Sequence, residues 1–191
     1  MAVMAVTGDI GAGKSTVSKL LSEKFNSEVF DADKIAKNLW ELETVKNQAV
    51  SRWGKSIIDS EGNIIKSKIS EFIFTNKDEW EFCNNLIHPK VMAELEKLSL
   101  KFNNVILEVP LLFEAKFHII KRLKIIYVTA DFNIRAERCK LQRGWTIEEL
   151  KRREKFLLPS DIKISMSDYV IYNNKSIYET GEKLNEFLCR N

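Results

Sequence analysis

The chain has 191 residues, and its 30 Lys and Arg against 27 Asp and Glu leave a net charge of only +3. This length suits one domain with insertions, and the small charge argues against a nucleic acid or another large polyanion as partner. No apolar run approaches the roughly 20 residues that span a bilayer, and the start lacks the basic leader of a secretory signal. The three cysteines form no CxxC pair, which favours reduced structural thiols over a zinc site or disulfide framework. We therefore expect a cytoplasmic protein without a membrane partner.

Short apolar runs alternate with longer amphipathic stretches along the whole chain. The runs predict strands, and the 3.6-residue spacing of apolar positions predicts helices. Strands that are apolar throughout and separated by helices indicate a parallel sheet covered on both faces, hence an α/β fold. The stretch 34–101 has no strand pattern and is interpreted as an inserted helical subdomain. The predicted strands are 3–7, 28–30, 104–109, 123–129 and 169–172, and the predicted helices are 14–25, 34–53, 67–75, 77–101, 131–142, 147–157 and 175–189.

A glycine-rich segment follows the first predicted strand. Residues 8–15 read GDIGAGKS, which fits the phosphate-loop pattern G-x-x-x-x-G-K-[ST] and carries three of the chain's seven glycines. Its N–H groups and the start of the next helix are expected to point at an anion. In this pattern Lys14 reaches the β- and γ-phosphates, the Ser15 hydroxyl ligates Mg²⁺ and Thr16 contacts the α-phosphate. We expect ATP and Mg²⁺ here, with contacts from Gly8, Asp9, Ile10, Gly11, Ala12, Gly13, Lys14, Ser15 and Thr16.

The rest of the chain narrows the class of phosphate-loop protein. A GTPase would carry an NKxD-type guanine motif, and the nearest string, NNKS at 173–176, lacks the aspartate. Motor and transport ATPases are usually longer. A small kinase for a metabolite or nucleotide remains. Such an enzyme needs an acceptor pocket opposite the γ-phosphate and a lid that excludes water.

Five segments occur in an order that resembles the dephospho-CoA kinase family along nearly the whole chain: GDIGAGKST at 8–16, DADKIA at 31–36, IHP at 87–89, EVPLLFE at 108–114 and SDYVIYN at 167–173. The resemblance implies transfer of the γ-phosphate of ATP to the 3′-hydroxyl of dephospho-CoA, the last step of coenzyme A biosynthesis. It also implies a three-layer phosphate-loop fold with a five-stranded parallel sheet. On this basis residues 1–191 form one kinase domain, with a core at 1–33, 104–130 and 165–191, an acceptor-binding helical insertion at 34–103 and a helical lid at 131–160.

The resemblance assigns acceptor-side roles to residues near the second strand and inside the insertion. Asp33 is the catalytic candidate, because a carboxylate there could accept or orient the proton of the attacking hydroxyl. The alternative is an N-cap of the helix at 34–41. Asp31 is expected near the acceptor, where it could touch Mg²⁺ through water or simply shape a turn. His88 is an acceptor-side candidate or a structural histidine, and Pro89 most simply begins a new helix.

The PLLFE segment begins where the third strand ends. By resemblance, Pro110, Leu111, Leu112 and Glu114 line the acceptor pocket. The competing interpretation is core packing for at least two of the three apolar residues 111–113. Glu108, on the strand itself, could hold a Mg²⁺-bound water.

Arginines mark the predicted lid. Arg135 and Arg138 are three apart and share a helix face, and guanidinium groups can stabilise charge on a transferring phosphoryl group. By resemblance Arg138 is catalytic. The family's second arginine falls at Gln142 here, so Arg143 beside it is assigned that role. Leu157 departs from the family's Gln, although Arg153 matches the preceding arginine.

Two questions stay open at the level of sequence. Asn173, after the fifth strand, is either a nucleotide contact near the adenine or a turn asparagine. The rival functions are another small phosphate-loop kinase for a nucleoside monophosphate or metabolite, and a nucleotide-binding module without phosphotransfer. Gln142 and Leu157 are the only hints of the second rival. The sequence sets no oligomeric state.

Overall fold

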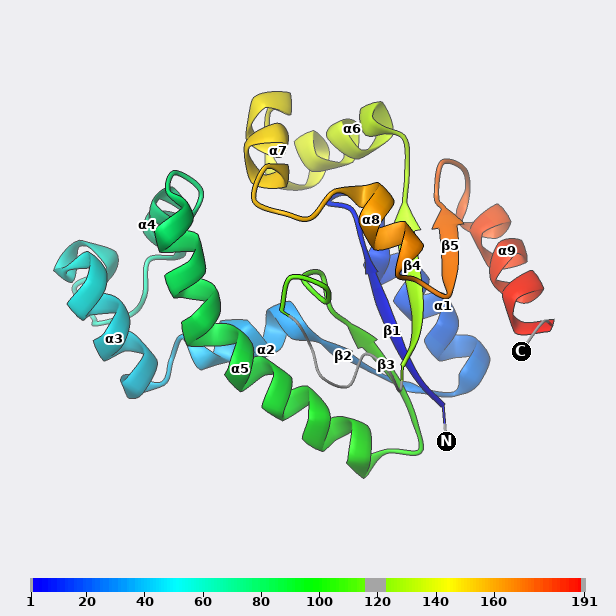
Figure 1. Ribbon diagram of the computed structural model, residues 1–191, viewed down its shortest axis with the longest axis horizontal. Helices are drawn as coiled ribbons and strands as arrows, with labels where there is room; N and C mark the ends of the chain where they lie inside the picture. The colour runs from blue at the N-terminus through cyan, green and yellow to red at the C-terminus, as the bar shows by residue number, and fades with distance from the viewer. Residues whose placement is uncertain (1, 116–122, 190–191) are drawn as a thin grey trace. The chain divides into compact units, whose positions relative to one another are not determined.

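The computed structural model describes residues 2–115 and 123–189, and it is drawn in Figure 1. The chain divides into two compact units, one made of Met1–Asp31 with Leu95–Asn191 and the other of Ala32–Glu94. Within the described ranges, no helix combines the length and the apolar character that crossing a membrane requires.

The first unit is built on a parallel five-stranded sheet whose order is β2-β3-β1-β4-β5. Its strands lie close to the five predicted runs, which confirms the prediction of a five-stranded parallel sheet. Their bounds are β1 Ala2–Gly8, β2 Glu28–Asp31, β3 Asn104–Glu108, β4 Lys124–Thr129 and β5 Tyr169–Tyr172. Because all five run the same way, their carboxyl ends share one edge of the sheet.

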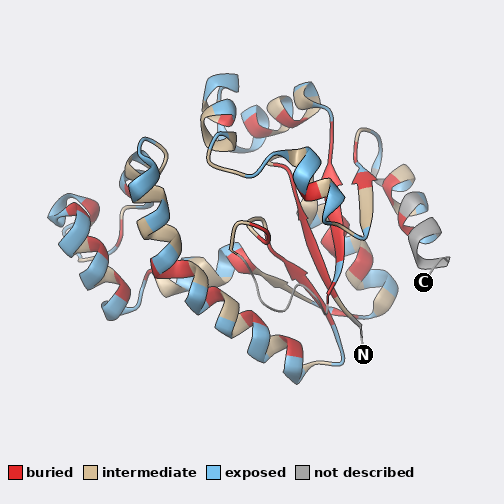
Figure 2. Ribbon diagram, in the orientation of Figure 1, coloured by how far each residue is buried: buried red, intermediate tan, exposed pale blue. Residues whose placement is uncertain are grey.

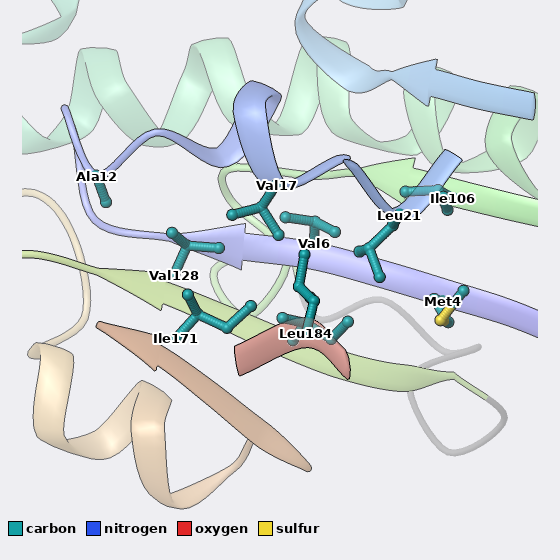
Figure 3. Packing of buried hydrophobic residues seen from close by; sticks show 10 residues of the cluster. Met4, Val6, Ala12, Val17, Leu21, Ile106, Val128, Ile171 and Leu184 are labelled. Carbon is teal, nitrogen blue, oxygen red and sulfur yellow. The ribbon is translucent and has the colours of Figure 1, made fainter. Parts of the chain in front are cut away.

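Both faces of this sheet are buried. On one face, α1 (Lys14–Phe25) and α9 (Ile177–Cys189) pack Val17 and Leu184 against Val6 and Val128, as Figure 3 shows. Alternate strand residues point to the opposite face, and they are buried as well: Ala5, Val105, Leu107, Ile125 and Tyr127 are all between 0% and 2% exposed. Figure 2 shows the same burial along β1, β3 and β4. The predicted three-layer α/β arrangement is therefore confirmed.

Three further helices follow β4 in the first unit. Two of them, α6 (Phe132–Arg143) and α7 (Ile147–Glu154), match the predicted helices at 131–142 and 147–157. Gly144 ends α6 in a left-handed conformation with φ of 67°, and Thr146 caps α7 by accepting the N–H of Glu149 at 3.2 Å. The third helix, α8 (Ser160–Ser165), was not predicted, because six residues are too few to show a helical period.

The second unit is helical. It contains α2 (Ala32–Leu39), α3 (Glu43–Trp53), a short 3₁₀ helix (Lys55–Ile57), α4 (Lys66–Ile73) and most of α5 (Lys77–Lys101). Its aromatic cluster centres on Trp53, which stacks on Phe72 at 5.9 Å and meets the edge of Phe82 at 5.2 Å between ring centroids. Glu79 accepts hydrogen bonds from the Trp53 indole at 2.6 Å and from Arg52 at 2.8 Å. The stretch thus has a core of its own.

The single helix predicted at 34–53 is wrong. The chain leaves the α-helical pattern after Leu39, where the N–H groups of Glu41 and Leu42 bond carbonyls only three residues back. A new helix then starts at Glu43. The apolar spacing continues across this turn, so the periodicity alone could not reveal it.

The expectation that Pro89 begins a helix is also wrong. Pro89 lies in the middle of the 25-residue helix α5. It lacks an N–H, so the Asn85 carbonyl one turn earlier loses its usual helical donor. Both residues are exposed, which lets water solvate that carbonyl.

Candidate active site

The phosphate loop joins β1 to α1 at the carboxyl edge of the sheet. Gly8 has a φ of 146°, and a Cβ placed there would lie 1.9 Å from the Val128 carbonyl oxygen. Gly13 has a φ of 89°, and its Cβ would lie 2.4 Å from Nδ2 of Asn173. Backbone conformation and space therefore both require glycine at these two positions.

The carbonyl groups of this loop are bonded by positively charged side chains. Lys14 Nζ donates to the Gly8 carbonyl at 3.2 Å and to the Asp9 carbonyl at 2.9 Å. Arg135 Nη1 donates to the Ile10 carbonyl at 3.1 Å, and Arg138 Nη1 to that of Ala12 at 3.3 Å. These bonds hold the loop in shape ahead of the N-terminus of α1, a position that suits an anion.

Oxygen ligands lie beside this helix start. Ser15 Oγ donates to Glu108 Oε1 at 2.7 Å, and Asp31 at the end of β2 is in register with Glu108 at the end of β3. Among the described residues, no cluster of three His, Cys, Asp or Glu could hold a metal by itself. A hydroxyl with a nearby carboxylate suits Mg²⁺, which keeps several waters and shares its coordination with substrate phosphates. The donor set therefore fits the magnesium ion predicted from the loop pattern.

Asp9 is buried behind the loop, and sequence reasoning missed its surroundings. Its carboxylate accepts hydrogen bonds from the hydroxyls of Tyr127 at 2.7 Å, Thr129 at 2.6 Å and Ser160 at 2.6 Å. Its N–H donates to the Val128 carbonyl at 3.0 Å. Burial alone would raise the pKa of Asp9, but the three hydroxyls and the charge of Arg135 together hold this pKa below its ordinary value. Asp9 therefore supports the loop from behind as an ionised carboxylate.

Two arginines of α6 lie against the phosphate loop. Arg135 is buried, donates to the Ala130 carbonyl at 3.0 Å and pairs with Glu154 of α7. Arg138, one turn later, donates to the Asn173 carbonyl at 3.0 Å. The two arginines therefore attach α6 to the loop, which agrees with their placement on one helix face.

Asn173 also faces this loop. Its side-chain amide donates to the Ala12 carbonyl at 2.8 Å, and its oxygen accepts the Thr180 hydroxyl at 2.9 Å. These bonds place Asn173 directly behind the phosphate loop. A contact with the adenine stays a prediction.

The third predicted lid arginine has a different environment. Arg143 is exposed at the end of α6, next to the exposed Gln142, and its guanidinium carbon lies 4.7 Å from the centre of the Trp145 ring. Arg153 lies over the same ring at 4.0 Å and forms an ion pair with Glu149 at 2.7 Å. Stacking on an aromatic ring restricts an arginine while leaving its N–H edge available. This arrangement could not be predicted from the sequence, because Arg143, Trp145 and Arg153 lie in two different helices and the turn between them.

The segment after β3 is mostly packed inward. Leu112 and Phe113 are buried, which confirms core packing for two of the three apolar residues, whereas Pro110 and Leu111 are half-buried. The Glu114 side chain is only 3% exposed and forms an ion pair with the buried Lys163 at 3.3 Å. The carboxylate of Glu114, which was predicted to contact the acceptor substrate, therefore already has a charged partner in Lys163.

The remaining acceptor candidates belong to different units. Asp31 lies in the first unit with the phosphate loop, whereas Asp33 and His88 lie in the second. The N-cap interpretation of Asp33 is wrong, because α2 already begins at Ala32 and Asp33 stands in its first turn. An exposed carboxylate in that turn still interacts favourably with the helix dipole. The catalytic role of Asp33 and the acceptor role of His88 stay predictions.

Comparison with known proteins agrees with this geometry. The family model for dephospho-CoA kinase matches residues 2–179. Dephospho-CoA kinase of Fusobacterium nucleatum is 37% identical over 97% of this chain and 96% of its own length, and that of Aquifex aeolicus is 33% identical over 95% and 93%. The crystal structure of TT1252 from Thermus thermophilus superimposes with a TM-score of 0.78 at 26% identity and covers 99% of this chain and 97% of that one. The chain belongs to the dephospho-CoA kinase family.

Proposed function

We propose that this protein transfers the γ-phosphate of ATP to the 3′-hydroxyl of dephospho-CoA and so completes coenzyme A. The observation that carries the proposal is the family match over residues 2–179, which includes a phosphate loop of the required geometry. A small phosphate-loop kinase needs positioned charge more than covalent chemistry, because in-line transfer spreads negative charge over the phosphoryl oxygens.

The proposed roles on the donor side follow from the contacts of the loop. Lys14 reaches the β- and γ-phosphates from its place beside the Gly8 and Asp9 carbonyls. Arg138 and Arg143 supply guanidinium groups from the lid, the first against the Ala12 carbonyl and the second over the Trp145 ring. These three cations stabilise the developing charge.

On the acceptor side, Asp33 orients the attacking hydroxyl or accepts its proton. Asp31, His88 and the turn formed by Pro110, Leu111, Leu112 and Glu114 hold the rest of dephospho-CoA. These roles rest on the resemblance of DAD, IHP and PLLFE to the family's segments.

Ser15 would ligate Mg²⁺, and Glu108 would hold a water bound to the ion. The ion, when bound, neutralises charge on the β- and γ-phosphates and helps to orient them. The hydrogen bond between Ser15 and Glu108 places both oxygens at one end of the loop and supports this assignment. The proposed site of action is the cytoplasm, where the free thiols of Cys83 and Cys139 stay reduced.

The test incubates the purified chain with ATP, Mg²⁺ and dephospho-CoA and follows coenzyme A by chromatography. We expect turnover with dephospho-CoA and none with nucleoside monophosphates or shikimate. Lys14→Ala should lower kcat by about two to three orders of magnitude, whereas Lys19→Ala, on the exposed side of the same helix, should not change it. Folded protein that binds ATP but phosphorylates none of these acceptors would instead favour a nucleotide-binding module.

A further inference from the structure

The carboxylate of Asp9 accepts hydrogen bonds from hydroxyl groups in two segments that are far apart in the sequence. Tyr127 and Thr129 belong to β4, and Ser160 begins α8. All three hydrogen bonds are 2.6–2.7 Å long, and Asp9 is 5% exposed. A buried carboxylate is costly unless its oxygens are satisfied, and here three donors satisfy them.

The two places are the two ends of one helical segment. The chain leaves the sheet after Thr129, forms α6 and α7, and returns at Ser160. The residues that flank 130–159 on either side, Thr129 and Ser160, therefore both donate a hydrogen bond to the Asp9 side chain. We call this segment the lid segment, and its two ends meet at Asp9.

The returning end is attached at a second point as well. The Leu158 N–H donates to Glu114 Oε1 at 3.1 Å, and Lys163 Nζ pairs with the same oxygen at 3.3 Å. Ser160 thus stands between two anchored residues, so its backbone is held close to Asp9. Its hydrogen bond to Asp9 links this fixed end to the phosphate loop.

Asp9 acts on the loop through its backbone. Its carbonyl accepts Lys14 Nζ at 2.9 Å and the Ala12 N–H at 3.2 Å, and its N–H bonds Val128. Holding the Asp9 side chain therefore holds the peptide groups that position Lys14 and the turn at Ala12. The position is one of the variable ones in G-x-x-x-x-G-K-[ST], so the loop pattern itself does not demand a carboxylate there.

We propose that Asp9 is a positioning residue whose carboxylate holds both ends of the lid segment against the phosphate loop. The conformation of the loop and the position of the ends of the lid segment are then determined together. We call the three hydrogen bonds to this carboxylate, from Tyr127, Thr129 and Ser160, the clasp. The inference rests on the proposed function only in taking ATP as the ligand of the loop. Loosening the clasp at Ser160 should weaken ATP binding, because the loop is then less well organised before the nucleotide arrives.

The test measures ATP affinity directly by calorimetry and, separately, the KM values for ATP and dephospho-CoA. Ser160→Ala should raise the dissociation constant and the KM for ATP about tenfold, as expected for a lost hydrogen bond to a charged group, and leave the KM for dephospho-CoA unchanged. Ser160→Thr keeps the hydroxyl and should restore ATP affinity. The matched control is Ser165→Ala on the same helix, whose hydroxyl donates to the Ile162 carbonyl at 2.8 Å.

A double-mutant cycle decides whether Asp9 is the partner that matters. In an Asp9→Ala background, Ser160→Ala should have no further effect on ATP affinity. Additive effects, or wild-type ATP affinity in Ser160→Ala, would overturn the clasp. If Asp9→Ala does not fold, the ATP affinities of Ser160→Ala, Ser165→Ala and Ser160→Thr test the proposal by themselves. Since ATP affinity is measured without an acceptor, a wild-type protein that binds ATP but does not phosphorylate dephospho-CoA would refute the proposed function and leave the clasp testable.

Discussion

Ser15 Oγ donates a 2.7 Å hydrogen bond to Glu108 Oε1 across 93 positions of sequence. The serine is the second residue of the helix that follows the phosphate loop, and the glutamate ends the neighbouring strand β3. Glu108 is 6% exposed, so little bulk water competes for this oxygen. The pair joins a hydroxyl and a carboxylate at the edge of the sheet where the loop turns.

Replacing Glu108 with Gln should raise the Mg²⁺ concentration required for half-maximal activity. The amide keeps the size and the hydrogen bond to Ser15 but loses the charge, and loss of such a supporting group typically weakens metal binding about tenfold to hundredfold. The measurement is a Mg²⁺ titration at saturating ATP and dephospho-CoA. Glu28→Gln, at the exposed start of β2, is the control. An unchanged titration curve would show that Glu108 does not support the metal.

How far the site could be predicted depends on whether its partners are close in sequence. The phosphate loop was predictable because Gly8, Gly13, Lys14 and Ser15 lie within eight residues and act through one turn. Even there, the sequence could not reveal why Gly13 tolerates no side chain. The atom in the way belongs to Asn173, 160 positions later.

The clasp at Asp9 shows the opposite case. Tyr127 and Thr129 alternate on one strand, so a shared face could be inferred from their spacing. Ser160 could not be linked to them, because it begins a six-residue helix that carries no period. Long-range polar contacts of this kind depend on the packed fold and leave no local pattern.

In the helical unit too, features with a local sequence pattern could be predicted and features without one could not. Helix α5 was predicted with its observed bounds from the helical spacing, although the separate expectation of a new helix at Pro89 was wrong. The break between α2 and α3 was missed, because it occurs without glycine or proline. The roles of Asp33 and His88 were suggested only by resemblance, and they stay predictions.

Gly13→Ala should destabilise the protein and abolish tight ATP binding. A Cβ would lie 2.4 Å from the Asn173 amide, and the φ of 89° is itself unfavourable for alanine. We expect a loss of about 1–3 kcal/mol in the free energy of unfolding from the backbone conformation and more from the clash. Urea denaturation and calorimetry with ATP measure the two effects.

Gly144→Ala provides the matched comparison. Gly144 has a φ of 67°, but among the described residues no atom beyond its own chain neighbours lies within 4 Å of its virtual Cβ. It should therefore show the conformational cost alone, about 1–2 kcal/mol. Equal losses in the two variants would contradict the clash with Asn173.

Lys163→Met should destabilise the protein strongly, because it leaves the buried Glu114 carboxylate without its charged partner. The two side chains are 2% and 3% exposed, and breaking one side of such a pair typically costs about 3–5 kcal/mol. Glu114→Leu combined with Lys163→Met removes both charges and should recover much of this loss. Urea denaturation of the single and double variants checks the expectation.

An exposed ion pair serves as the control for that experiment. Lys175 pairs with Glu179 at 3.1 Å, and its side chain is 71% exposed. Lys175→Met should change the free energy of unfolding by about 0.5 kcal/mol or less, since such pairs are screened by water and salt. If the double variant Glu114→Leu, Lys163→Met is no more stable than Lys163→Met alone, the cost does not come from an unpaired charge.

The last prediction concerns pH. Hydrogen bonds from Ser160, Thr129 and Tyr127 and the charge of Arg135 outweigh burial and lower the pKa of Asp9 in the folded protein. A carboxyl group whose pKa is lower when folded than when unfolded stabilises the fold at high pH, and this contribution disappears as the pH falls through the folded pKa. The free energy of unfolding of wild type should therefore exceed that of Asp9→Asn by a constant amount from neutral pH down to about pH 5. The difference should shrink below about pH 5, where the unfolded carboxyl begins to bind its proton. Urea denaturation of both proteins between pH 7 and pH 3 measures it, with the exposed Asp161→Asn as control. A difference that stays constant down to pH 3 would show that the hydrogen bonds from these hydroxyls do not lower the pKa of Asp9.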